Sequence, residues 1–408
     1  MSVAGLSASR LRRMREVLSG YVERGELTGF VALVSRGGEV HVECGRYERD
    51  TIFRLASMTK PIAAAAALRL VEDGVIRLDD GIDELLPELA GLQVLRSIES
   101  PVDDTVPLSR PITLRDVLTN TMGTGVVFAE PGTYPIQAAL GGAGFEAGLG
   151  PKPGPEEFLR RLARVPLVHQ PGEAWMYNIA SDVLGILVSR AAKQSFGDFL
   201  RERIFEQLGM RDSAFWVPPE KISRLPRAYL PDEKAGGLKL EDEAAGGIFS
   251  EPPALESGAG GLVATVDDFH AFARMLLDRG AIAGGRILAE STVEAMTSDQ
   301  LSEEVKSRSP WTPGWFASHG WGYGVGVVTA ADDSIDLALS PFDPEFRSDG
   351  GASAPGAYGW SGGYGTTWRN DPAKDLAAVL MTQVGMVSAA GPTFFRDFLN
   401  LAFAAVDD

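Results

Sequence analysis

The sequence predicts an α/β (α+β) fold in which an antiparallel sheet is built from both ends of the chain. Three observations support it: an amphipathic helix and a hairpin pattern near the N-terminus, a long Pro- and Gly-rich helical middle, and strand patterns followed by a helix near the C-terminus. We therefore expect residues 1–61 and 256–408 to form an α/β sheet domain and residues 62–255 an inserted, mainly helical domain. Binding sites often lie between domains, so the active site is expected in the cleft between these two.

The N-terminal part predicts a helix and a hairpin. Apolar residues recur at helical spacing from Leu11 to Val22 and indicate an amphipathic helix over residues 8–24. Two β-rich runs, residues 30–35 and 39–44, flank a Gly-Gly turn and predict a hairpin. The helix should cover the sheet to which this hairpin belongs.

The middle of the chain indicates helices joined by long loops, including the low-complexity stretch 141–155, with few strand signals. The run Thr265-Val-Asp-Asp268 then predicts a capping box before a helix over residues 269–277. Towards the C-terminus we expect strands at residues 321–328, 360–368 and 376–383, a turn at 369–373, and a final helix at 392–406 beside the N-terminal one.

Composition is that of an acidic globular protein, with 45% hydrophobic and 23% charged residues. The net charge of −17 and the scattered basic residues argue against a nucleic acid or an anionic membrane as partner. The single cysteine, Cys44, excludes an internal disulfide and is expected to be a small apolar filler. Charges interrupt the N-terminal apolar residues before a signal-peptide core could form, so we expect a cytoplasmic protein.

Neither a membrane span nor a cofactor is expected. The longest apolar run, residues 62–68, is far shorter than the roughly 20 residues that cross a bilayer. The four histidines lack metal-ligand spacing, and the chain has no nucleotide-binding glycine motif between a strand and a helix. We therefore predict no metal and no cofactor.

The chemistry is expected where an apolar run meets an alanine-rich helix. There Ser57-Met-Thr-Lys60 places a hydroxyl and an amine on one helix face, close enough for the amine to take the hydroxyl proton. A chain of this length carries roughly one Ser-x-x-Lys match by chance, and this is its single match. The alternative interpretation is a capping serine beside a surface lysine.

A nucleophilic Ser–Lys pair needs a third polar group that carries protons to the leaving group. Tyr177 is the candidate, because the pKa of a phenol lies near that of a lysine and a proton can pass between them at small cost. A core or rim aromatic residue is the alternative interpretation.

A rival nucleophile is Ser361, because Gly359-Trp-Ser-Gly-Gly363 matches the Gly-x-Ser-x-Gly elbow of α/β-hydrolases. That fold places its catalytic histidine after the serine, whereas every histidine here lies upstream of Ser361. We therefore expect these residues to form a β-strand edge, where glycines admit a substrate and the Gly363 N–H faces the oxyanion.

Four motifs follow one another along the chain: Ser57-Met-Thr-Lys60, Tyr177-Asn-Ile179, Ser257-Gly-Ala-Gly-Gly and Trp360-Ser-Gly-Gly363. Their order and spacing are informative. With them the chain resembles the serine β-lactamase and penicillin-binding-protein superfamily over nearly its whole length. Within that superfamily it looks most like the family VIII carboxylesterases, which share the class C β-lactamase fold and act on simple esters. The resemblance implies a β-lactamase/transpeptidase-like fold.

Departures from the superfamily pattern favour an esterase. Lactamases and peptidases usually carry Lys-Thr-Gly where this chain has Trp360-Ser361-Gly362, so a cation that binds substrate carboxylates is missing. The tyrosine motif ends in Ile179 instead of Asn, which removes an amide that would hold a β-lactam side chain.

The resemblance implies a serine hydrolase that cleaves short-chain carboxylic esters, with a small-molecule ester as its partner. Ser57 would form the acyl-enzyme while Lys60 and Tyr177 move protons. The backbone N–H groups of Ser57 and Gly363 would hold the oxyanion. The expected substrate-binding residues are Trp360, Ser361, Gly362, Asn178, Ile179, Phe128 and Tyr134.

Several alternatives remain open. Phe128, Tyr134 and Phe145 are expected to wall the acyl pocket from the loop 126–155, although packing of a surface loop is an equal alternative for each. Other activities of the same fold are those of a β-lactamase, a D-alanyl-D-alanine peptidase or an acyltransferase. A non-catalytic binding protein that keeps the fold is the alternative from a different class.

Overall fold

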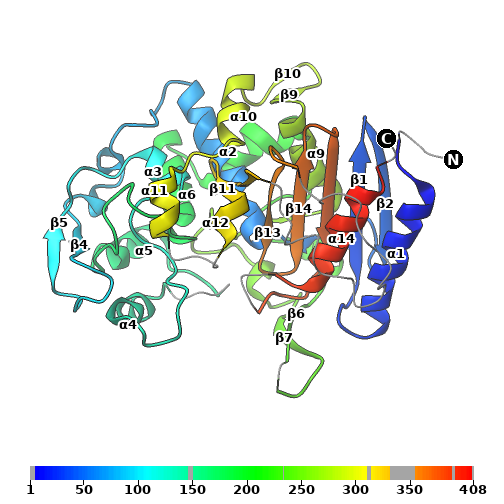
Figure 1. The fold of residues 1–408 in the computed structure, drawn as a ribbon, viewed down its shortest axis with the longest axis horizontal. Helices are drawn as coiled ribbons and strands as arrows, with labels where there is room; N and C mark the ends of the chain where they lie inside the picture. Colours follow the sequence, from blue (N-terminus) through cyan, green and yellow to red (C-terminus); the bar gives the residue numbers. More distant parts are fainter. Residues whose placement is uncertain are drawn as a thin grey trace.

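The computed structural model describes residues 5–145, 150–232, 234–309, 314–330, 354–387 and 391–406. Within these residues, seven strands form one antiparallel sheet in the order β11-β12-β13-β14-β15-β1-β2 (Figure 1). The strands are β1 Phe30–Arg36, β2 Glu39–Gly45, β11 His319–Trp321, β12 Gly326–Val328, β13 Tyr358–Gly362, β14 Thr366–Asp371 and β15 Leu376–Met381.

Both ends of the chain build the sheet, as expected. The N-terminal strand β1 pairs with the C-terminal strand β15, with Val31 opposite Met381. On the front of this sheet lie helices α1 (Ala8–Glu23) and α14 (Thr393–Ala404), side by side (Figure 1). The predicted packing of the final helix against the N-terminal helix is therefore confirmed.

Strand β1 is buried on both faces, because helices cover the two sides of the sheet. Phe30, Ala32 and Val34 pack with α1 and α14, whereas Val31 and Leu33 face the main core. Helix α9 (Val266–Leu277) packs on that second face against β1, β14 and β15. The alternation follows from the two-residue period of strand side chains.

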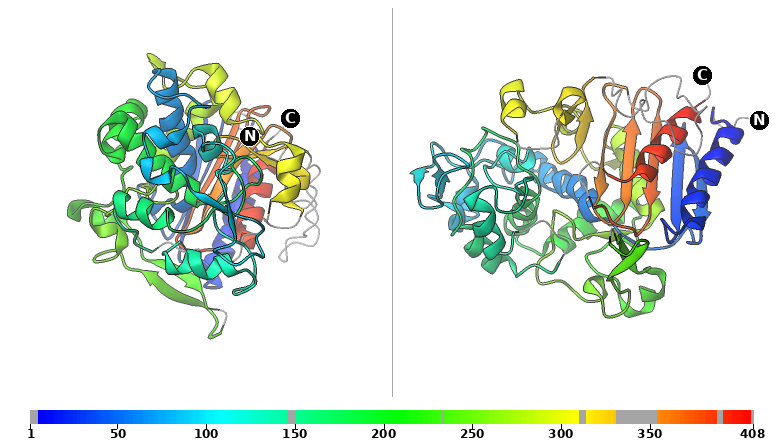
Figure 2. Two further views of the ribbon diagram at one scale, coloured as in Figure 1. Left: turned by 90° about the vertical axis from the view of Figure 1, so that its left-hand side faces the viewer. Right: turned by 60° about the horizontal axis from the view of Figure 1, so that its bottom comes forward.

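Beside the sheet lies a body of helices and loops, seen at the opposite end of the molecule's long axis (Figures 1 and 2). At its centre α2 (Thr59–Glu72) packs on α6 (Ile179–Ala192). Residues 63–67 of α2 are all alanine and fully buried, so the two helices can approach closely. The other helices are α3 Leu114–Leu118, α4 Pro135–Gly142, α5 Pro155–Leu162, α7 Phe196–Leu200, α8 Glu206–Leu208, α10 Glu290–Met296, α11 Glu303–Arg308 and α12 Trp315–Ser318.

Short two-stranded pairs complete the fold. One of them joins β3 (Phe53–Arg54), just before Ser57, to β8 (Val263–Ala264). The others are β4 Gln93–Leu95 with β5 Thr105–Pro107, β6 Ala228–Pro231 with β7 Leu238–Asp242, and β9 Ala281–Ile282 with β10 Gly285–Arg286. The strict domain boundaries at residues 61 and 256 stay a prediction.

Three strand predictions need correction. The strand predicted at 321–328 is a hairpin, because the chain turns at Gly324, whose φ of +76° favours glycine. The strand predicted at 360–368 is also a hairpin, β13–β14, which turns at Gly365 with φ +86°. Strand β14 continues to Asp371, so the turn predicted at 369–373 begins later. Glycines within an apolar run marked turns that hydrophobicity alone did not reveal.

The predicted capping box before α9 is only half formed. The Thr265 side chain accepts from the Asp268 N–H, as expected. The Asp268 carboxylate instead accepts from the Asp212 N–H (2.8 Å) and the Ser213 hydroxyl (2.9 Å). The Asp268 carboxylate therefore binds a neighbouring segment instead of the Thr265 N–H, which the capping box would require.

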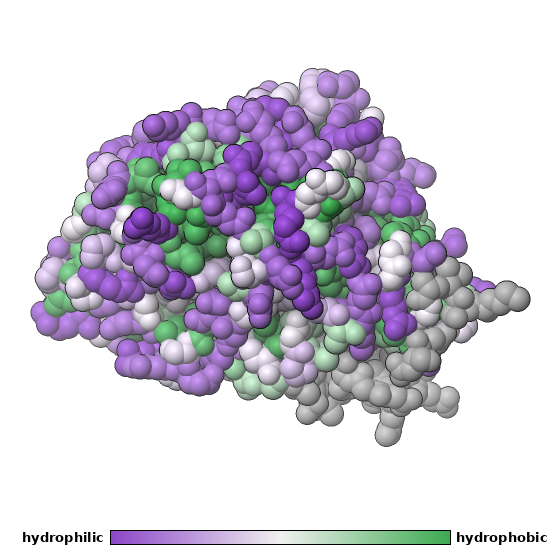
Figure 3. All heavy atoms as spheres, turned by 90° about the horizontal axis from the view of Figure 1, so that it is seen from above, coloured by the Kyte–Doolittle hydropathy of each residue, from purple (hydrophilic) through white to green (hydrophobic). Residues whose placement is uncertain are grey.

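The predicted N-terminal helix and hairpin are confirmed, and Cys44 is a free, partly buried thiol on β2 that packs against the core. Figure 3 shows mostly hydrophilic residues on the upper face, with hydrophobic residues in patches between them. None of the helices in the described residues is both long enough and apolar enough to cross a bilayer.

Candidate active site

Ser57 lies in a single 3-10 turn, Ala56–Met58, that leads into α2. Lys60 is 1% exposed, and its Nζ donates to Ser57 Oγ at 2.9 Å. The amine also donates to Asn178 Oδ1 (2.9 Å) and to the Ala259 carbonyl (2.7 Å). The interpretation as a capping serine beside a surface lysine is therefore wrong, because the lysine is buried against the serine.

These three acceptors of Lys60 are neutral, and burial decides its protonation. Desolvation lowers the pKa of the Lys60 amine well below 10.5, although the charge of Asp182 acts to raise it and that of Lys152 to lower it further. A neutral amine in contact with a hydroxyl is a competent base.

Tyr177 lies against this pair. Its ring centroid is 4.5 Å from Lys60 Nζ, and its hydroxyl accepts a hydrogen bond from Trp360 Nε1 at 2.6 Å. Burial raises the pKa of the Tyr177 phenol, while hydrogen bonds with Ser57 and Trp360 act in the opposite direction. The phenol therefore lies between the serine and an indole donor.

An aromatic cluster holds the phenol in place. Trp175 stacks on Tyr177 with centroids 5.5 Å apart, and Trp360 lies 5.6 Å from the same ring. Trp321 packs edge-on against Trp360 at 4.7 Å. The interpretation of Tyr177 as a core aromatic is therefore half right: its ring packs like one, but its hydroxyl faces Ser57.

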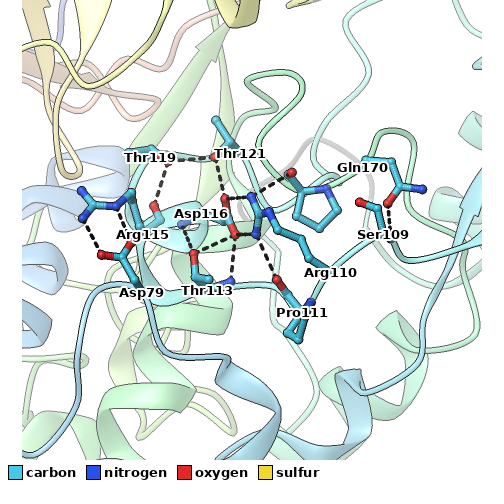
Figure 4. A network of polar contacts seen from close by, with 11 residues as sticks. Asp79, Ser109, Arg110, Pro111, Thr113, Arg115, Asp116, Thr119, Thr121 and Gln170 are labelled. Carbon is cyan, nitrogen blue, oxygen red and sulfur yellow. Dashed lines mark hydrogen bonds and ion pairs between the residues drawn. The ribbon is translucent and has the colours of Figure 1, made fainter.

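A polar network fixes the segment that leads into the phenol (Figure 4). Arg110 donates to both carboxylate oxygens of the buried Asp116, at 2.6 and 2.8 Å, and to the Pro171 carbonyl at 2.9 Å. The Asn120 carbonyl, a few residues on, accepts the Met176 N–H at 2.8 Å. The ion pair between Arg110, in the loop before α3, and Asp116 of α3 thus helps to position the chain before Tyr177.

Two strained residues flank the chemistry. Ala56, just before Ser57, has φ 46°, and Asn178, just after Tyr177, has φ 89°. Positive φ at residues other than glycine costs on the order of 1–3 kcal/mol and persists only where the surroundings impose it. Because Ala56 precedes Ser57 and Asn178 follows Tyr177, we infer that packing sets the direction of the Ser57 and Tyr177 side chains.

The tip of the β13–β14 hairpin lies against the chain just before Ser57. Thr366 Oγ1 donates to the Leu55 carbonyl at 3.0 Å, and a Cβ added at Gly362 would meet the same oxygen at 2.1 Å. Only glycine permits this approach, which brings the neighbouring Gly363 into the same region. The role of its N–H as an oxyanion donor stays a prediction.

The predicted strand edge holds only locally. Strand β13 is interior to the sheet, between β12 and β14. Its pairing with β12 covers Tyr358 and Gly359, so among the described strands Trp360, Ser361 and Gly362 pair with β14 alone. Because β12 is short, the backbone of residues 360–362 is unpaired on the side of β13 that faces β12, among the described residues.

A cavity of about 70 Å³ opens beside Ser57, with mainly apolar walls. Besides Ser57, the lining residues are Gly150, Pro151, Lys152, Asn178, Phe215, Ile248, Phe249, Pro253, Leu255, Ser257, Ala259, Gly260 and Gly261.

Three residues predicted to wall the acyl pocket lie elsewhere in the structure. Neither Phe128 nor Tyr134 is among the described residues that line this cavity. Phe128 is 41% exposed, and Tyr134 begins α4, where its N–H donates to Gln137 Oε1 at 3.0 Å. Phe145 is buried against Phe158. The same loop lines the cavity through other residues, Gly150, Pro151 and Lys152, and its residues 146–149 lie outside the described residues.

Four further residues predicted to bind substrate have contacts within the protein, and their substrate-binding role stays a prediction. Ile179 is 3% exposed in the main core, because it begins α6 and its side chain packs inward. The Asn178 side chain binds Lys60. Ser361 Oγ is hydrogen-bonded to Thr367 Oγ1 across the hairpin at 2.8 Å. The indole of Trp360 is engaged by Tyr177.

Sequence reasoning missed two polar residues at this site, Lys152 and Asp182, and named Ser257 only as part of a motif, without a role. Lys152 and Ser257 line the cavity, and both contact the carboxylate of the buried Asp182. Asp182 lies four residues after Asn178 on α6, so helical spacing was a usable signal for it. Lys152 lies in a low-complexity loop that gave none. Among the described residues, no group of three His, Cys, Asp or Glu side chains could hold a metal ion.

Three known proteins show what this chain is similar to. Esterase EstB of Burkholderia gladioli is 31% identical, with 95% of this chain and 93% of EstB covered. Lovastatin esterase of Penicillium rubens is 30% identical, with 81% and 79% covered. The solved structure of EstCE1, described as a hydrolase with promiscuous acyltransferase activity, superposes with a TM-score of 0.75 at 23% identity, covering 97% and 98%.

The family model described as Beta-lactamase matches residues 14–389, nearly the whole chain. That match spans the Ser57 turn, the Tyr177 segment and the β13–β14 hairpin that meet at the site. The chain belongs to the beta-lactamase family.

Proposed function

We propose that the protein is a serine hydrolase, similar to the family VIII carboxylesterases, that cleaves short-chain carboxylic esters through an acyl-enzyme on Ser57. The observation that carries this proposal is the environment of Lys60. Its amine is buried among neutral groups: it donates to Asn178 Oδ1 and the Ala259 carbonyl, and it lies 2.9 Å from Ser57 Oγ, whose hydroxyl can donate to the lone pair of the neutral amine. A buried lysine without a hydrogen-bonded carboxylate has its neutral form favoured, which is the form that removes a proton.

In the proposed reaction Ser57 Oγ attacks the ester carbonyl, and its proton passes to Lys60 and Tyr177. The backbone N–H groups of Ser57 and Gly363 hold the negative charge on the former carbonyl oxygen. Tyr177 then protonates the departing alcohol, so the C–O bond breaks and the acyl group stays on Ser57. Water, deprotonated by the same groups, releases the acid and restores the serine.

Trp360 supplies a neutral donor where related enzymes carry a cation. Its indole N–H binds the Tyr177 oxygen at 2.6 Å, which stabilises negative charge on the phenol without adding a positive charge to the substrate site. Together with the apolar cavity walls, this favours an uncharged acyl group. The names of the two esterase relatives support the same substrate class.

Acyl transfer to an alcohol or amine is the second candidate. It is favoured by the relative named acyltransferase mokF of Monascus pilosus, 26% identical over 74% of each chain. The same acyl-enzyme serves both outcomes, and the acceptor decides between them. Addition of a small alcohol during turnover would divide the product between acid and new ester if transfer occurs.

The test is turnover of p-nitrophenyl butyrate and, separately, of the β-lactam nitrocefin. We expect butyrate hydrolysis that falls roughly 10⁶-fold in Ser57→Ala, because the nucleophile is lost. Ser361→Ala is the matched control and should retain activity, because Ser361 Oγ binds the Thr367 hydroxyl across the hairpin. Loss in Ser361→Ala with activity kept in Ser57→Ala would overturn the site. Faster turnover of nitrocefin would indicate a β-lactamase.

A further inference from the structure

A second lysine lines the cavity beside Ser57. Lys152 lies in the loop before α5 and forms an ion pair with Asp182 of α6. The Asp182 side chain is 1% exposed and that of Lys152 is 24% exposed, so the carboxylate is buried behind the amine. A buried carboxylate requires such a partner, because its charge is otherwise uncompensated.

Asp182 is built into the two segments that hold Lys60. On α6 it lies one turn after Asn178, which accepts from the Lys60 amine. Its Oδ1 accepts from Ser257 Oγ at 2.5 Å, and Ala259, two residues further on, provides another acceptor of Lys60. The ion pair and the Lys60 amine therefore share both supporting segments.

We propose that Lys152 is a positioning residue for the reaction: by pairing with Asp182 it cancels the carboxylate charge that would otherwise keep Lys60 protonated. The inference rests on the proposed function, because it concerns Lys60 as a base. Without Lys152 the buried carboxylate would take Lys60 as its countercharge, and an ammonium cannot accept the serine proton.

The charged and titratable groups around Lys60 support this direction. Helix α6 presents Asp182, the loop before α5 presents Lys152, and the segment before α6 presents the Tyr177 phenol. Burial is the largest effect and lowers the Lys60 pKa; Asp182 raises it and Lys152 lowers it. The reaction of Ser57 requires neutral Lys60, so its rate rises with pH as Lys60 loses its proton; this rising part of the pH profile is the acidic limb. A higher Lys60 pKa moves the acidic limb to higher pH.

The test is the pH dependence of Ser57 modification by a fluorophosphonate, which needs the activated serine but no particular ester. The Ser57 Oγ–P bond forms, the P–F bond breaks, fluoride leaves and the serine proton goes to the base. In Lys152→Met we expect the acidic limb to move to higher pH, so labelling slows about tenfold or more at pH 7 and recovers at high pH.

Two matched variants separate charge from loop packing. Lys152→Arg keeps the positive charge, so the acidic limb of its labelling profile should lie at the same pH as in the unmodified protein. The double variant Lys152→Met/Asp182→Asn has neither charge and should return the limb close to that of the unmodified protein. A loss in Lys152→Met that is equal at every pH, or a limb that does not move, would overturn the proposal and leave the ion pair a purely structural contact.

The outcome is distinct from failure of the proposed function. If the unmodified protein hydrolyses no ester yet Ser57 is labelled and the limb moves in Lys152→Met, the ester assignment fails and the inference stands. If Ser57 is not labelled at any pH, the proposed nucleophile and this inference both fail.

Discussion

Arg54 and Lys60 are two buried basic side chains on either side of Ser57, and their surroundings differ in charge. The Arg54 side chain is 0% exposed and forms an ion pair with Asp242 at 2.7 Å, with further hydrogen bonds to Gln383 and to two carbonyls. Lys60 is equally buried but donates to a hydroxyl, an amide oxygen and a carbonyl. Arg54 has a carboxylate in contact, and Lys60 has only neutral partners in contact.

This difference distinguishes a basic side chain that stabilises the fold from one that can act as a base. Arginine keeps its charge in proteins, and with Asp242 it ties β3, before the nucleophile, to the end of β7. A lysine can lose its proton when burial favours the neutral form. Lys306 makes the same point, because ion pairs with Asp299 and Glu303 outweigh its burial and raise its pKa, whereas the pKa of Lys60 is lowered.

Lys60→Met should reduce kcat for p-nitrophenyl butyrate by about 10³- to 10⁴-fold, because the proposed base is lost. Steady-state kinetics on the folded variant measure this. Lys306→Met is the matched control, a mostly buried lysine paired with carboxylates, and should keep kcat within about threefold. Equal losses in the two variants would remove the distinction between an unpaired and a paired lysine.

Arg54→Met should lower the free energy of unfolding by about 3–5 kcal/mol, because Asp242 is left buried without a countercharge. Urea unfolding followed by circular dichroism gives the value. Arg49→Met removes an exposed ion pair with Asp267 and should cost about 0–1 kcal/mol. A cost for Arg54→Met no larger than that of Arg49→Met would contradict a structural role for the buried pair.

Lys60→Met should be more stable than the unmodified protein at pH 7, and this advantage should shrink as the pH approaches 10.5. Folding lowers the pKa of Lys60, so between the folded and unfolded pKa values the unfolded chain binds the extra proton and stability rises with pH. Each tenfold weakening of proton binding on folding corresponds to about 1.4 kcal/mol. Unfolding both proteins at pH 7 and pH 10 tests this; a difference independent of pH would mean that Lys60 stays charged.

Trp360→Phe should lower kcat by about 10- to 100-fold, because the indole N–H no longer stabilises charge on the Tyr177 oxygen. Trp315→Phe, a change in the same aromatic cluster, tests whether ring packing alone matters and should have a smaller effect. Similar losses in both variants would attribute the effect to packing of the cluster.

The sequence by itself determined the parts that depend on local pattern. Helical spacing and the Gly-Gly turn were enough to predict α1 and the β1–β2 hairpin, because both form from neighbouring residues. The order of the Ser57, Tyr177 and Trp360 motifs was enough to indicate the superfamily. Two hairpins at the C-terminal end were predicted as single strands, because hydrophobicity does not distinguish one strand from two; the glycines at their turns, Gly324 and Gly365, were the overlooked signal.

Only the tertiary structure decided which groups surround the lysine. Asn178 and Ile179, adjacent in sequence, differ completely: one holds Lys60, and the other lies in the core because the strained turn leads directly into α6. Lys152 is distant from Ser57 in sequence and came from a loop without pattern. Whether a buried amine is a structural cation or a base depends on the charges that folding brings near it, and those charges come from distant segments.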